Sequence, residues 1–91
     1  MSIEHDRDAH RFTSVAPSGT AILAYAPAGA GVVELYSTYV PHAERGKGLA
    51  GRLVEAAVEY ARSEGLRIIP SCWYVAQWIE QHPEHRDLLS T

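Results

Sequence analysis

Residues 32–72 follow a strand–helix–strand order, and this order constrains the fold of the chain more than any other feature. β-branched and aromatic residues dominate residues 32–40, which predicts a strand that ends at Pro41. Apolar residues then recur at i, i+3 and i+4 over residues 49–63, which predicts an amphipathic helix. Residues 67–72 predict a second strand. A helix between two strands of one sheet makes them parallel, with a right-handed connection.

Two shorter β segments precede this unit. Residues 11–15 and 20–26 flank the turn residues Pro17-Ser18-Gly19, which favours a small antiparallel meander. Residues 1–10 are polar, and we expect them to be flexible or to form an edge of the sheet.

The second strand of the unit contains Pro70, which cannot donate a ladder hydrogen bond. We therefore expect the two parallel strands to diverge toward their carboxyl ends. Residues 75–82 predict a short C-terminal helix. The predicted fold class is α+β: a mixed sheet with an antiparallel N-terminal meander, then a βαβ unit with splayed parallel strands and a C-terminal helix. At 91 residues, we expect a single domain over 1–91.

Composition and charge exclude several classes of function. One cysteine leaves no internal disulfide and no Cys-rich zinc site, and His82 and His85 around Pro83 fit a structural turn better than a metal site, so we expect no metal. A net charge of -3 does not favour binding to nucleic acid or to a membrane surface. A polar start and the absence of a long apolar run make a cytoplasmic protein the expectation.

The segment Arg45-Gly46-Lys47-Gly48-Leu49-Ala50 joins the longest predicted strand to the predicted helix. A helix N-terminus presents unpaired N–H groups, glycines allow a close approach of the backbone, and Arg45 and Lys47 add positive charge. Together they favour a site for a phosphate or pyrophosphate. The alternative is a glycine-rich connection with solvated basic side chains. The spacing matches neither a Walker loop nor a Rossmann motif.

The same segment matches the R/Q-x-x-G-x-G/A motif, and the chain resembles the GNAT superfamily of acetyltransferases from about residue 12 to residue 89. The stretch Pro70-Ser71-Cys72-Trp73-Tyr74-Val75 resembles the small single-domain members of that superfamily. These carry a cysteine at the end of the strand that follows the CoA-binding helix.

This resemblance implies acetyl-CoA, or coenzyme A, as the cofactor and an amine of a protein or small molecule as the acceptor. The implied activity is an acetyl-CoA-dependent N-acetyltransferase. The backbone at Arg45, Gly46, Lys47, Gly48, Leu49 and Ala50 would hold the pyrophosphate. Backbone groups near Tyr39 and Val40 would pair with the pantetheine arm, and Cys72 would face the thioester.

Three residues are the catalytic candidates, each with a structural alternative. Cys72 is an acetyl acceptor or a buried small hydrophobe. Tyr74 protonates the leaving thiolate of CoA or packs under the helix. Glu34 is a general base or a solvent-facing strand carboxylate.

Two features of the sequence favour functions other than catalysis. Ser37-Thr38 stands where some small relatives carry a His-Thr pair. A chain this short also leaves no room for the N-terminal helices that wall the acceptor site in larger GNAT enzymes. A CoA-binding module with little or no catalytic activity is therefore the alternative function, and a protein-interaction groove is the third.

Overall fold

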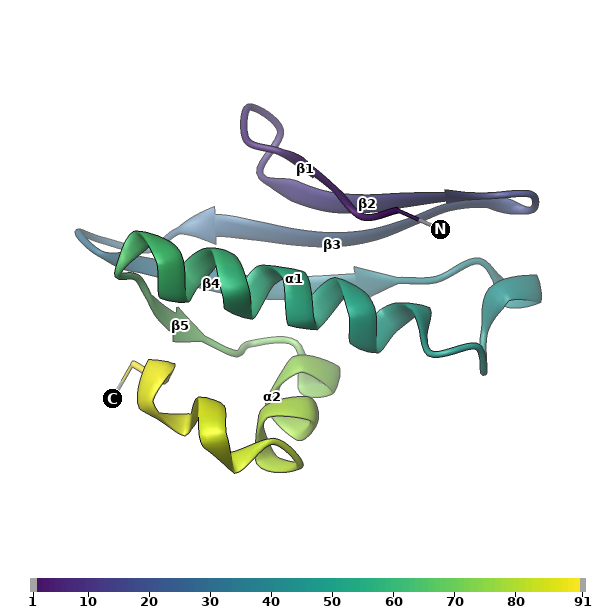
Figure 1. The fold of residues 1–91 in the computed structure, drawn as a ribbon. Helices are drawn as coiled ribbons and strands as arrows, with labels where there is room; N and C mark the ends of the chain where they lie inside the picture. The colour runs from purple at the N-terminus through teal and green to yellow at the C-terminus, as the bar shows by residue number, and fades with distance from the viewer. Residues whose placement is uncertain (1, 91) are drawn as a thin grey trace.

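The computed structural model describes residues 2–90 and contains a five-stranded sheet in the order β1-β2-β3-β4-β5 (Figure 1). The first four strands are antiparallel neighbours, and β4 and β5 are parallel. The strands span β1 Glu4–Asp6, β2 Arg11–Ala16, β3 Gly19–Pro27, β4 Val32–Tyr39 and β5 Arg67–Ile69. This arrangement confirms the predicted α+β class, with a meander followed by a βαβ unit.

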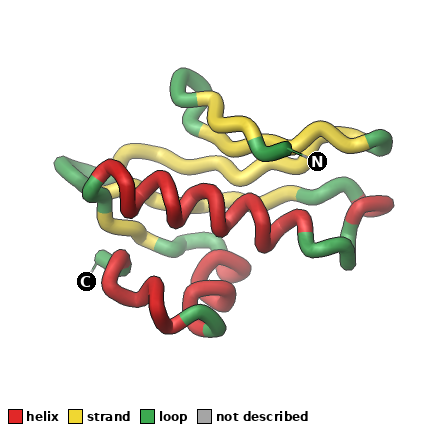
Figure 2. Tube along the Cα trace, in the orientation of Figure 1, coloured by secondary structure: helices red, strands yellow, loops and turns green. Residues whose placement is uncertain are grey.

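The long helix α1 (Leu49–Glu64) runs along one face of the sheet, and α2 (Trp73–Glu80) packs beside it (Figures 1 and 2). Two 3-10 segments complete the fold: η1 (His42–Glu44) precedes α1, and η2 (Pro83–Leu88) follows α2. No helix among residues 2–90 is long and apolar enough to span a membrane.

The core lies between α1 and the sheet. Buried positions alternate along β2 and β3, whereas in α1 they follow the helical period. The largest fully buried side chains are aliphatic: Leu23, Leu35, Leu53, Ile68, Ile79, Val54, Val58 and Val75. The helix ends at Gly65, whose φ of 69° is the left-handed conformation that glycine adopts without strain.

Around Pro70 the structure corrects the predicted boundaries. The ladder of β5 stops at Ile69, so the strand is shorter than the predicted 67–72, because Pro70 has no N–H to donate. The helix α2 begins at Trp73, two residues before the predicted start. Cys72 is therefore the N-cap of α2 rather than the last residue of a strand.

A β-bulge in β4 changes which side chains face α1. Ser37 pairs with Ala24 and Leu35 pairs with Tyr25, so Tyr36 is an extra residue in β4. Beyond the bulge Thr38 lies opposite the fully buried Leu23. A bulge shifts the alternation of a strand by one residue, so Thr38 points to the α1 face although regular alternation from Leu35 would turn it away.

His5 fixes the edge strand β1 to the rest of the fold. Its ring stacks on Phe12 with 4.1 Å between centroids, and its Nε2 lies 2.6 Å from the Tyr25 hydroxyl. Burial, with a smaller contribution from the nearby Arg7, lowers the pKa of His5 below its usual value.

We expect this histidine to make the fold less stable in acid. Because the pKa of His5 is lower in the folded state, its contribution is fully present above the unfolded pKa of about 6.5 and is lost as the pH falls through the folded pKa. Urea unfolding of the parent and of His5→Phe, measured at several pH values, checks this. The parent should lose more stability than the variant between neutral and mildly acidic pH, and equal losses would contradict the assignment.

Candidate functional site

A cavity of about 600 Å³ opens where β4 and β5 part. The ladder between the strands ends at the pair Glu34 and Ile69, and one further bond runs from the Cys72 amide to the Leu35 carbonyl at 3.0 Å. Beyond that point β4 continues to Tyr39 paired with β3 but without β5 on its other side. The predicted divergence of the parallel strands therefore forms the cavity, whose size is typical of small-molecule sites.

Three segments line this cavity. The end of β4 contributes Thr38, Tyr39 and Val40; the loop and first turn of α1 contribute Arg45, Gly46, Gly48, Leu49 and Ala50; the start of α2 contributes Cys72, Trp73 and Tyr74. All the residues that the sequence predicts for cofactor binding line this cavity except Lys47. The structure thus brings the glycine loop, the end of β4 and Cys72 together around one space.

The loop before α1 exposes its backbone to this space. Gly46 and Gly48 have φ values of 83° and 78°, and a Cβ added to either would meet nothing within 4 Å. Gly48 is the N-cap of α1, so the unpaired N–H groups of the first turn follow it directly. These glycines leave an open approach to a helix N-terminus, which suits a phosphate.

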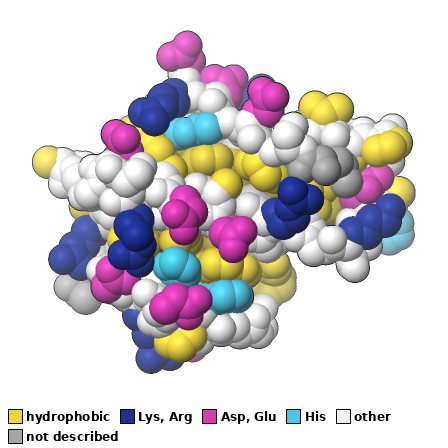
Figure 3. All heavy atoms as spheres, in the orientation of Figure 1, with side chains coloured by type: hydrophobic (Ala, Val, Ile, Leu, Met, Phe, Trp, Pro, Cys, Tyr) yellow, Lys and Arg dark blue, Asp and Glu magenta, His cyan; other side chains and the backbone are white. Residues whose placement is uncertain are grey.

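Both basic side chains of the loop have internal partners. Arg45 donates from Nε to the Val40 carbonyl at 3.1 Å, which holds its guanidinium against the end of β4. Lys47 lies with its Nζ 3.5 Å from a carboxylate oxygen of the buried Glu44. Figure 3 shows Lys and Arg side chains at the end of the molecule where η1 and the start of α1 lie.

Cys72 is half-buried, and its Sγ lies 3.5 Å from the Thr38 hydroxyl. Burial raises the pKa of this thiol, but hydrogen bonds from the Thr38 hydroxyl and from backbone groups at the start of α2 together lower the pKa below its usual value. Cysteine reacts as the thiolate, and a helix N-terminus favours that form. These contacts are of the kind that stabilise a thiolate, which a nucleophilic role would require.

Removing the Thr38 hydroxyl should make Cys72 less reactive. Thr38→Val keeps the shape of the side chain but loses the hydrogen bond to the thiolate, so the pKa of Cys72 should rise. The rate of alkylation by iodoacetamide, measured against pH, should then have its midpoint at a higher pH than in the parent. An unchanged midpoint would show that Thr38 does not stabilise the thiolate.

Two aromatic residues follow Cys72 at the cavity. The Tyr74 hydroxyl packs against α1, where a Cβ added to Gly51 would lie 3.5 Å from it. Trp73 is 74% exposed although it is the largest apolar side chain at the site. Tyr74 thus lies at the cavity, as the sequence predicts, and Trp73 lines it, in keeping with its prediction as a core or groove-wall residue. Thr38 is a lining residue that sequence reasoning missed.

Glu34 lies elsewhere. Its carboxylate accepts a hydrogen bond from the Ser71 hydroxyl, and it is not among the residues that line the cavity. It sits on the paired part of β4, before the bulge. The structure does not bring Glu34 together with Cys72 and Tyr74.

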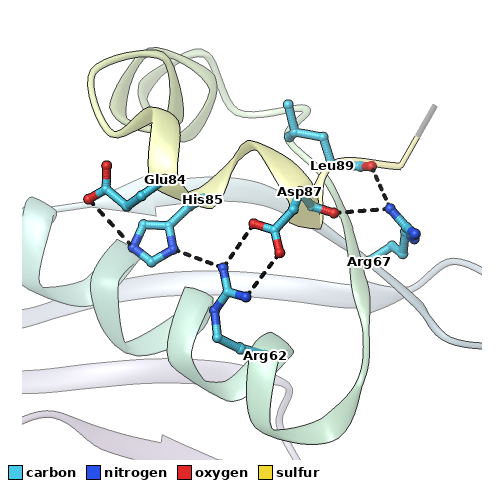
Figure 4. A network of polar contacts seen from close by, with 6 residues as sticks. All are labelled: Arg62, Arg67, Glu84, His85, Asp87 and Leu89. Atoms are coloured by element: carbon cyan, nitrogen blue, oxygen red, sulfur yellow. Dashed lines mark hydrogen bonds and ion pairs between the residues drawn. The ribbon is translucent and has the colours of Figure 1, made fainter.

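The C-terminal histidines serve packing and polar contacts. His82 stacks on Trp78 with 3.8 Å between ring centroids. Figure 4 shows His85 and Asp87 of η2 around the Arg62 guanidinium, whose contacts to the two oxygens of Asp87 measure 2.9 and 3.0 Å. Within the described part of the chain, no group of three or more His, Cys, Asp or Glu side chains could hold a metal ion.

A glycine loop at a helix N-terminus, beside parallel strands that part to form a cavity, defines the class: an α+β domain with a candidate site for a phosphate-containing ligand. A family model for the GCN5-related N-acetyltransferases matches residues 11–88, and the chain belongs to this family.

The relatives with similar sequences include Protein NATD1 of several vertebrates. The protein from Bos taurus is 38% identical over 86 residues, which covers 91% of this chain and 75% of the relative. The protein from Homo sapiens is 37% identical over the same shares. The NMR solution structure of a GCN5-like protein from Staphylococcus aureus has the same fold, with a TM-score of 0.73, 22% identity, and coverage of 98% of this chain and 87% of that one.

Proposed function

We propose that this chain, as one domain over residues 1–91, is an acetyl-CoA-dependent N-acetyltransferase that uses Cys72 as an acetyl acceptor. The observation that carries the proposal is that one cavity is lined both by the glycine loop before α1 and by Cys72, whose Sγ lies 3.5 Å from the Thr38 hydroxyl. A cytoplasmic location belongs to the proposal, because the chemistry needs a reduced thiol.

The residues present fit acetyl-CoA as the donor substrate. The open backbone at Gly46 and Gly48 suits the pyrophosphate, with Leu49 and Ala50 supplying first-turn amides. The end of β4 at Tyr39 and Val40 has no strand partner on the side of the cavity, so its backbone is available to the pantetheine arm. Cys72 lies where β4 and β5 part, which is where an arm between the strands would end.

The proposed chemistry needs two groups of the chain at the thioester. The Cys72 thiolate attacks the acetyl carbon, the bond from that carbon to the sulfur of CoA breaks, and the leaving thiolate takes a proton from the Tyr74 hydroxyl. An amine then attacks the acetyl group on Cys72. The amide forms, the Cys72 thiolate leaves, and the proton of the amine passes to the Tyr74 phenolate through water, which restores both groups. Glu34 stays a prediction as a general base that acts directly or through water on the acceptor amine.

One observation favours the alternative of a CoA-binding module without catalysis. Within residues 2–90 the contacts of the Cys72 thiol are to the Thr38 hydroxyl and to backbone groups rather than to a histidine or carboxylate. A thiolate without a general base beside it depends on the hydrogen bonds and the helix N-terminus alone.

Mass spectrometry of the intact protein after incubation with acetyl-CoA tests the proposal without knowledge of the acceptor. We expect a mass increase of one acetyl group, mapped to Cys72 and removed by a lysine peptide or by spermidine with formation of the acetylated amine. Acetyl-CoA binding without adduct or transfer would favour the binding module. If acetyl-CoA did not bind at all, a protein-interaction groove would be the remaining candidate function.

A further inference from the structure

We propose that Glu44 is a positioning residue for the loop that receives the pyrophosphate, acting through Lys47 and anchored by Ser18. This inference rests on the proposed function, because it assigns a task to a residue that does not itself line the cavity. The glycine motif does not include Glu44, and sequence reasoning gave it no role.

The Glu44 side chain is buried, which is unusual for a carboxylate. Glu44 is the last residue of η1, directly before Arg45, and only 5% of its surface is exposed. Each carboxylate oxygen has its own partner: the Ser18 hydroxyl donates to Oε2 at 2.9 Å, and the Lys47 ammonium lies 3.5 Å from Oε1. Glutamate is almost never fully buried unless it is paired, so this arrangement indicates a specific use of the charge.

The anchor comes from a distant part of the chain. Ser18 belongs to the turn between β2 and β3, which is 26 residues before Glu44 in the sequence. Gly19, the first residue of β3 after this turn, lies close to the base of the loop, since a Cβ added to it would lie 3.3 Å from Pro41 Cγ. Glu44 thus connects the turn between β2 and β3 to the exposed side chain of Lys47.

This connection sets the position of Lys47 before any ligand arrives. Lys47 does not itself line the cavity, but it stands between Gly46 and Gly48, which do. A lysine ammonium has three donors, so the contact with Glu44 leaves others for a phosphate oxygen at the mouth of the cavity. The Lys47 side chain is 60% exposed and would otherwise sample many rotamers. Fixing a flexible cation in advance reduces the entropy lost on binding. With Arg45 held on the Val40 carbonyl, both cations of the loop are then preorganised.

Glu44→Gln and Glu44→Leu test the proposal, with coenzyme A as the probe. Gln can still accept from Ser18 but loses the ion pair, and Leu fills the buried space without a charge. We expect Kd for coenzyme A to rise about three- to fivefold in Glu44→Gln and further in Glu44→Leu. The midpoint of thermal unfolding of Glu44→Leu should not fall, because an apolar side chain replaces a buried charge. A merely structural residue would lose stability and binding in parallel.

A double-mutant cycle asks whether Glu44 acts through Lys47. Lys47→Met should weaken coenzyme A binding, and Glu44→Gln should add little on the Lys47→Met background, because the partner is already gone. The matched control is Glu55→Gln, which removes an exposed carboxylate of α1 and should leave Kd unchanged. Additive effects, or tighter binding by Glu44→Gln, would overturn the proposal.

Amide hydrogen exchange of the ligand-free protein separates this inference from the proposed function. Exchange at residues 45–48 should be faster in Glu44→Leu than in the parent, whether or not the parent binds coenzyme A. If the parent fails to bind while exchange still responds, the proposed function fails and the anchoring of the loop stands. If exchange in this loop is the same in both proteins, Glu44 does not position it.

Discussion

Gly48→Glu should abolish acetyl-CoA binding, with Kd rising at least about a hundredfold. Gly48 is the N-cap of α1 and has a φ of 78°, so its backbone borders the cavity with no side chain in the way. A glutamate there would place a side chain and a negative charge where the pyrophosphate should lie. Isothermal titration calorimetry measures the loss, and circular dichroism checks that the fold survives.

Gly31→Glu is the matched control for this variant. Gly31 has a φ of 74° and open space around its Cβ position, so a glutamate there carries the same left-handed backbone strain, of about 1–2 kcal/mol. It lies in the turn before β4 and does not line the cavity. Gly31→Glu should lose stability to a similar extent and still bind. If the two variants bound acetyl-CoA with equal affinity, the glycine loop would not be part of the binding site.

Cys72→Ala should reduce acetyl transfer about a thousandfold or more and leave acetyl-CoA affinity nearly unchanged. The thiol is the group that takes the acetyl, whereas donor binding rests mainly on the backbone of the glycine loop and of β4. Cys72→Ser should behave in the same way, because a hydroxyl without an adjacent base is a weak nucleophile. Binding by calorimetry and release of CoA thiol are measured separately, and neither variant should give the acetyl adduct.

Retained transfer in Cys72→Ala would instead indicate direct attack of the amine on acetyl-CoA. Tyr74→Phe is then the informative variant, because the hydroxyl that protonates the leaving thiolate is lost while the ring still packs against Gly51. If transfer survives and Cys72 also resists alkylation in the native protein, the thiol is a buried hydrophobe and has no catalytic role.

The βαβ unit and the glycine loop could be predicted because each depends on local pattern. The period of apolar residues defines α1, and Gly65 ends it as expected. Pro70 predicted the divergence of β4 and β5, since the absence of one N–H is a local property with a structural consequence. The segment between Arg45 and Ala50 could be predicted as a loop at a helix N-terminus because it stands between a predicted strand and a predicted helix.

The features that sequence reasoning missed depend on register and on contacts between distant segments. The bulge at Tyr36 turns Thr38 toward Cys72, and no local pattern marks where an extra residue enters a strand. In the sequence Glu44 is one more charged residue of a polar loop, and only the fold places Ser18 beside it. For Glu34, residue type and place on a central strand predict a base, but they do not predict its hydrogen bond from the Ser71 hydroxyl.

An amide NMR titration with acetyl-CoA tests the central claim, that the donor binds in the cavity between β4 and β5, most directly. The proposal predicts chemical-shift changes in Tyr39 and Val40, in residues 45–50 and in residues 72–74, and little change around His5 at the opposite end of the sheet. Absence of shift changes at saturating acetyl-CoA, or changes that map to another surface, would contradict it.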